Sequence, residues 1–189
     1  MACPAPSPLH PSEDLPVRHP VVLLAIGAAV ALAGACKSST TETVVVPKSN
    51  IINFKATMSG ASEVPANATT GTGTFTATLD TVTNVFTYDI TFSGLTSNVN
   101  NGHIHGPAVT TVSSGTTINF NTLTGATFGG FGATTGTAHG QVTLNGLVQI
   151  TAAISGDSLR KILLAGLTYA NIHTVNNPGG EIRGQILKQ

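Results

Sequence analysis

Charge is scarce in this sequence. Asp, Glu, Lys and Arg make up 8% of the 189 residues, and the formal net charge is zero. A chain without a basic field cannot attract a phosphate backbone, so we expect no nucleic-acid partner. Tryptophan is absent and aromatic residues amount to 5%. The polar residues are mainly threonine, serine and asparagine, and with 21 glycines they are typical of short strands joined by tight turns.

Long apolar runs are also lacking. The apolar stretch over residues 21–35 is shorter than the roughly 20 residues that span a bilayer. It has the length of the hydrophobic region of a secretory signal, and it ends in Ala33-Gly34-Ala35, a small-residue cleavage pattern. Residues 1–20 are proline-rich and carry Glu13 and Asp14, unlike the start of a signal, which suggests that translation begins near Val17.

Cysteine is nearly absent, with only Cys3 and Cys36. Cys36 follows the cleavage pattern directly and precedes a Ser/Thr-rich tether, an arrangement that resembles a bacterial lipoprotein signal. That resemblance implies lipid attachment at Cys36 and a membrane anchor; ordinary cleavage and secretion with Cys36 free is the alternative. Either way Cys3 is lost, so no intramolecular disulfide can form. We expect a signal over residues 1–35, a tether over 36–50 and one exported domain over 51–189.

Apolar residues at every second position predict strands in that domain. Residues 75–79 and 86–92 alternate in this way around a turn at 80–84, which predicts an antiparallel hairpin. Residues 167–174 and 181–187 predict a second one. We expect a helix over 157–166 with Asp157 or Ser158 as its cap, loops over 96–102 and 125–137, and one or two strands over 144–153. About eight short strands favour an all-β, antiparallel Greek-key β-sandwich or a flattened barrel, with one short helix.

Three histidines stand in two compact motifs. His103 and His105 are two residues apart on an expected strand end, so both imidazoles leave the same face. His173 shares the face of Tyr169 and Asn171 on a later strand. Imidazole is a ligand for zinc and copper, so His103, His105 and His173, with Glu63 or Glu181, form a candidate metal site.

A purely structural role for these residues is the alternative. The histidines would then donate to backbone carbonyls, Glu181 would pair with Arg183, and Glu63 would accept from backbone amides or pair with Arg183. A charge kept in so apolar a domain is expected to be partnered. The sequence carries no nucleophile triad, phosphate loop or pair of catalytic carboxylates, so we expect no enzyme.

The same motifs resemble the CHRD domain, the module first described in chordin. The resemblance spans residues 53–187 and rests on Ser59-Gly60-Ala61-Ser62-Glu63-Val64-Pro65, Gly102-His103-Ile104-His105-Gly106-Pro107, and residues 169–174 and 178–185. It implies a non-enzymatic binding or structural module at the cell envelope, outside the cytoplasm. Its partner would be an extracellular protein or a small-molecule ligand.

CHRD domains have also been compared with copper–zinc superoxide dismutases, which implies an immunoglobulin-like or dismutase-like sandwich. In that comparison His103 and His105 resemble the His-x-His strand, His173 a later ligand, and Arg183 an active-site arginine. A metal-dependent redox enzyme is therefore the alternative function. The bridging-histidine loop and the disulfide of those enzymes have no counterpart, and His139 is the remaining candidate ligand.

Overall fold

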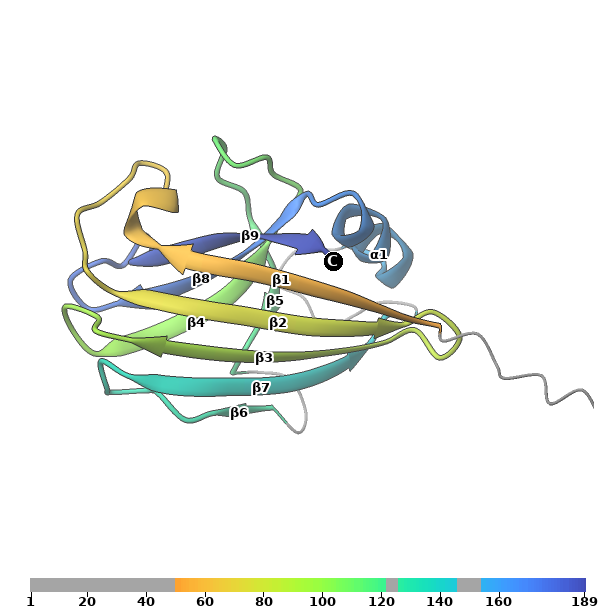
Figure 1. The fold of residues 1–189 in the computed structure, drawn as a ribbon, viewed down its shortest axis with the longest axis horizontal. Coiled ribbons are helices and arrows are strands. Elements are labelled where there is room, and N and C mark those ends of the chain that lie inside the picture. The colour runs from red at the N-terminus through yellow and green to blue at the C-terminus, as the bar shows by residue number, and fades with distance from the viewer. Residues whose placement is uncertain (1–49, 122–125, 146–153) are drawn as a thin grey trace, which may run out of the picture. The chain divides into compact units, whose positions relative to one another are not determined.

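The computed structural model describes residues 50–121, 126–145 and 154–189. The expected signal, the tether and Cys36 lie outside the described residues, as does most of the segment 144–153 in which further strands were expected. The described part contains strands, one short 3-10 turn and one α-helix (Figure 1). In chain order these are β1 (Ile51–Ser59), η1 (Gly60–Ser62), β2 (Thr72–Asp80), β3 (Val85–Ser93), β4 (Val99–His105), β5 (Thr116–Asn119), β6 (Thr127–Phe128), β7 (Gly136–Thr143), α1 (Gly156–Leu164), β8 (Thr168–Thr174) and β9 (Ile182–Lys188).

These strands form one antiparallel sheet in the order β5-β4-β8-β9-β1-β2-β3-β7-β6. The two predicted hairpins, β2–β3 and β8–β9, are present and pair residue by residue. β1 joins them, because it pairs with β2 on one side and with β9 on the other. The first and last strands of the domain are therefore neighbours in the middle of the sheet.

The alternation in β2 and β3 places their apolar residues in the core, as predicted. Phe75, Leu79, Phe86 and Ile90 are each at most 1% exposed. Thr91, which lies on the other face, is exposed. The sheet curls so that rings from distant strands meet: Tyr88 on β3 lies 5.1 Å from Phe120, just after β5. The expectation of an all-β, antiparallel fold with one short helix is confirmed, and its strands form one curled sheet with β5 and β6 at the edges.

Three local expectations differ from the structure. The cap of α1 is Ser155, whose side chain accepts from the backbone N–H of Ser158, and not Asp157 or Ser158. β4 begins at Val99, inside the segment expected to be loop. The segment 125–137, also expected to be loop, contains β6 and the start of β7. The alternation of β7 is weak because Gly136, Ala138 and Gly140 precede Val142 on its core-facing side and carry little hydrophobic signal.

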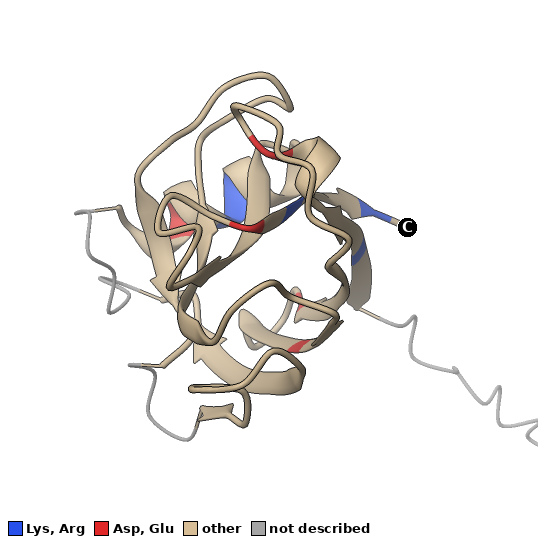
Figure 2. Ribbon diagram, turned by 90° about the vertical axis from the view of Figure 1, so that its left-hand side faces the viewer, with Lys and Arg blue, Asp and Glu red and all other residues tan. Residues whose placement is uncertain are grey.

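Charged residues occupy only short stretches of the ribbon (Figure 2). Within residues 50–121, 126–145 and 154–189, the single salt bridge joins His139 to Asp89, and both side chains are at least half exposed. Such an exposed pair adds little to stability. None of the helices in these ranges is long and apolar enough to cross a bilayer. The apolar core and the sheet ladder therefore carry the stability of the domain.

Candidate functional site

The polar face of β4, β8 and β9 carries most of the candidate residues. The antiparallel register sets His103 opposite Asn171 and His105 opposite Tyr169 on β8. On β9 the same residues of β8 face Arg183 and Gln185. Paired residues leave a sheet on the same side, so three strands contribute to one polar surface. The other side carries Ile104, Ile172 and Ile182, which are fully buried in the core.

Three histidines of this surface lie together. Nδ1 of His103 is 3.0 Å from Nε2 of His173, and the ring of His105 is 5.2 Å from that of His103 and 5.9 Å from that of His173. One nitrogen from each ring lies within 4.8 Å of the others. The three rings converge, as a three-histidine metal site requires, and metal binding itself stays a prediction.

Hydrogen bonds fix two of the imidazoles from behind. Nδ1 of His105 donates to the carbonyl of Ser114 at 2.9 Å, and Nδ1 of His173 donates to the carbonyl of Pro178 at 2.9 Å. A carbonyl only accepts, so in the neutral rings Nε2 keeps its lone pair. Burial lowers the pKa of His103 to about 3 and that of His105 to about 4, and it lowers the pKa of His173 as well. All three rings are therefore neutral at physiological pH.

A stack of side chains supports His105. Its ring lies parallel to that of Tyr169, with centroids 4.8 Å apart and 6° between planes. On the same Tyr169 ring, the guanidinium carbon of Arg183 lies 3.5 Å from the centroid, a cation–π contact. Nη2 of Arg183 also donates to the carbonyls of Val109 and Val112. Arg183 thus holds the loop after β4 and, through Tyr169, the position of His105.

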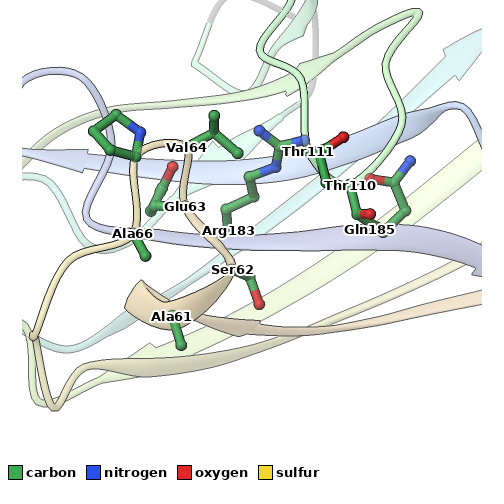
Figure 3. A pocket seen from close by; sticks show the side chains of 10 residues that line it. Ala61, Ser62, Glu63, Val64, Ala66, Thr110, Thr111, Arg183 and Gln185 are labelled. Carbon is green, nitrogen blue, oxygen red and sulfur yellow. The ribbon is translucent and has the colours of Figure 1, made fainter.

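A cleft of about 440 Å³ opens beside Arg183 (Figure 3). In the close-up, the loop that carries Glu63 lines one side, Thr110 and Thr111 line the other, and Arg183 and Gln185 lie on the strand between them. Gln185 donates to the carbonyls of Ala108 and Gly166, while its Oε1 has no partner.

Glu63 is the acidic residue of this cleft. It is 8% exposed, and its Oε1 accepts from Nδ2 of Asn171 at 2.7 Å. Burial raises the pKa of Glu63 to about 7, although the charge of Arg183 and the Asn171 hydrogen bond act in the opposite direction. A carboxyl with a raised pKa that lines a cleft is a candidate functional group.

Glu181 is placed apart from the histidines. It is fully buried, and its carboxylate accepts hydrogen bonds from Thr69, Thr96 and Asn177, which lie in three loops, and from Thr174 at the end of β8. Burial raises the pKa of Glu181, but the hydrogen bonds from Thr174, Thr69 and Thr96 outweigh it and the net pKa is lowered. Glu181 therefore joins these segments through hydrogen bonds and does not reach the histidine cluster.

The structure adds three residues to the expected set, namely Tyr169, Asn171 and Gln185. Their alternation with buried residues marked the face on which they lie, but not their contacts. Asn171 connects the two halves of the surface, because it is the register neighbour of His103 and the hydrogen-bond donor to Glu63. His139 lies elsewhere, since it is on β7 and bonds to Asp89. Three of the four histidines in the described residues therefore converge.

Comparison with known proteins agrees with these motifs. The sequence model of the CHRD domain matches residues 54–186, which include every residue of the polar surface described above. Neither a curated protein nor a solved structure matches the chain significantly. The match covers well over half of the sequence, so the chain belongs to the CHRD domain family.

Proposed function

We propose that this CHRD domain is a non-enzymatic binding module and that its ligand enters the cleft between the Glu63 loop and the loop at 108–112. The observation that carries the proposal is a buried acid and a buried cation in one cleft. Glu63 and Arg183 are 8% and 2% exposed, and both line the cleft. They do not form a salt bridge with each other in the described part of the chain.

Buried charges are normally paired, because desolvation costs several kcal/mol per ion. Here each charge is only partly satisfied: Asn171 donates to Glu63, and Arg183 donates to two carbonyls. A ligand with a donor for Glu63 or for Oε1 of Gln185, and an acceptor for Arg183, would complete both sets. Small polar molecules such as free amino acids and simple sugars have this combination of groups. Part of the lining is apolar, since Ala61, Val64 and Pro65 contribute to it.

Thermal-shift screening with the standard amino acids and common mono- and disaccharides tests the proposal. We expect at least one compound to raise the melting temperature of the wild-type protein by mass action. The Glu63→Gln variant should bind it at least tenfold more weakly. Asp89→Asn, which removes an exposed carboxylate outside the cleft, should bind it as the wild type does. No shift with any compound, or equal shifts in wild type and Glu63→Gln, would exclude a small polar ligand in this cleft.

We further propose that the domain acts outside the cytoplasm, anchored by lipid at Cys36. The support is the apolar stretch at 21–35, its small-residue end and the cysteine that follows. Mass spectrometry of protein purified from its native cells should find Cys36 as the acylated N-terminus. An unmodified N-terminus at Cys36 would leave secretion and remove the anchor, and retention of residues 1–35 would contradict both.

A further inference from the structure

We propose that His103, His105 and His173 form a binding site for one divalent transition-metal ion, zinc or copper. The site lies on the same polar surface as the cleft but uses none of the cleft's lining residues. It stands whether or not a ligand binds beside Glu63.

The main observation behind this proposal is that Nε2 of His105 is buried and has no hydrogen-bond partner. This side chain is 8% exposed. A buried nitrogen with a free lone pair costs free energy unless something binds it. Nε2 belongs to the group of three nitrogens that lie within 4.8 Å of one another. The unsatisfied lone pair and the convergence of the rings are independent observations that indicate the same ligand.

The hydrogen bonds behind the rings are those that metal-binding histidines make. Such a histidine donates its second ring N–H to a carbonyl, which fixes the tautomer and the ring orientation. His105 does so to Ser114 and His173 to Pro178. Both rings therefore present Nε2 as the ligand atom. Because Nε2 of His173 has only its lone pair, Nδ1 of His103 donates across the 3.0 Å contact. A metal ion bound to Nδ1 of His103 would require the proton of that ring to move to its Nε2.

The distances need only a small adjustment. With metal–nitrogen bonds of about 2.0–2.1 Å, two ligand atoms in a tetrahedral site lie about 3.3 Å apart. The His103–His173 contact of 3.0 Å is already near this value, and the separations of up to 4.8 Å must close by about 1.5 Å. His103 is half-buried and has no backbone hydrogen bond of its side chain among those described, so it is the ring best able to turn.

The donor set selects the class of metal. Three neutral imidazoles suit zinc and copper, whereas magnesium and calcium prefer carboxylate, carbonyl and water oxygens. Glu63 and Glu181 are not part of the cluster and bond elsewhere, Glu181 to Thr174 and Glu63 to Asn171. Three protein ligands leave a fourth position of a tetrahedral site for water or an external ligand.

Isothermal titration of the full-length, EDTA-treated protein, purified without a histidine tag, tests the site. We expect Zn²⁺ or Cu²⁺ to bind one ion per chain at a high-affinity site, and Mg²⁺ and Ca²⁺ not to compete. His103→Ala should weaken this binding at least a hundredfold, because it removes a ligand but no hydrogen bond to the backbone. His139→Ala removes an exposed histidine outside the cluster and should bind as the wild type does.

A measurement on the wild-type protein makes the test independent of folding in the variants. Nitrogen-15 NMR should show a shift of the His105 Nε2 resonance on addition of one equivalent of Zn²⁺. Equal metal affinity in wild type and His103→Ala, no binding in the wild type, or shifts confined to His139, His10 or His19 would overturn the proposal. Glu63→Gln should bind the metal as the wild type does, so a failure of the cleft proposal remains distinguishable.

Discussion

Removal of the Glu181 carboxylate should be among the most damaging single changes in this domain. Five hydrogen bonds end on it, at 2.6–3.1 Å, and it is fully buried. Hydrogen bonds to charged groups contribute about 1.5–3 kcal/mol each, so five would sum to about 7 kcal/mol or more. Hydroxyl groups that can rotate, and water that enters, reduce this sum. We therefore expect Glu181→Ala to lower the free energy of unfolding by about 3–5 kcal/mol.

The matched variant is Glu181→Gln, which keeps the shape of the side chain and one acceptor oxygen. The oxygen can remain at the position that receives Thr69 and the backbone N–H of Thr96, while the hydroxyls of Thr96 and Thr174 can rotate to accept from the new amide. Only Nδ2 of Asn177, which donates to Glu181 in the wild type, would then face another N–H donor. We expect a loss of about 1–2 kcal/mol, well below that of the alanine variant.

Urea unfolding followed by circular dichroism measures both effects. At a slope of stability against urea of about 2 kcal/mol per molar, the middle of the range for small proteins, Glu181→Ala should lower the midpoint by about 1.5–2.5 M. The lowered pKa of Glu181 means that its ionised form stabilises the fold above the unfolded pKa near 4.5 and that this contribution is lost as the pH falls. The gap between wild type and Glu181→Gln should shrink in acid. An alanine variant within about 1 kcal/mol of wild type would refute the reasoning.

Three further outcomes are expected. In the same urea assay, Ile90→Ala should lower the free energy of unfolding by about 2–5 kcal/mol, and Thr91→Ala, on the exposed face, by less than about 1 kcal/mol. Equal losses would mean that β3 is buried on both faces. Gly140→Ala should cost about 1–3 kcal/mol, because an added Cβ would overlap the Tyr88 ring. Gly115→Ala should be nearly neutral, because a Cβ added there has no atom within 4 Å. A neutral Gly140→Ala would show that Tyr88 can move. The pKa of Glu63 is raised from 4.5 to about 7, so between these pH values the folded state binds a proton that the unfolded state has lost. The stability of wild type relative to Glu63→Gln should therefore be highest below pH 4.5 and fall as the pH rises through 7. A stability difference that is constant with pH would place Glu63 in a solvated environment.

Local patterns in the sequence were enough to predict the parts of the fold that depend on neighbouring residues. The alternation at 75–79 and 86–92 identified β2, β3 and their buried face, since the side-chain period of a strand is fixed by backbone geometry. The same rule placed His103 and His105 on one side of a strand. β7 could not be found in this way. Its Gly136 and Gly140 leave room for the rings of Phe92 and Tyr88, so the apolar partners of this strand belong to β3.

The partners of the candidate residues were decided by the tertiary structure alone. His103 meets His173, which is 70 residues away, because β4 pairs with β8. Glu63 meets Asn171 across 108 residues, and Glu181 meets Thr69 across 112. Strand order follows from the packing of the whole core, which no local pattern records. By itself the sequence determined which residues share a face; the strand order and the curl of the sheet determined which of them touch, and so separated Glu181 from the histidines.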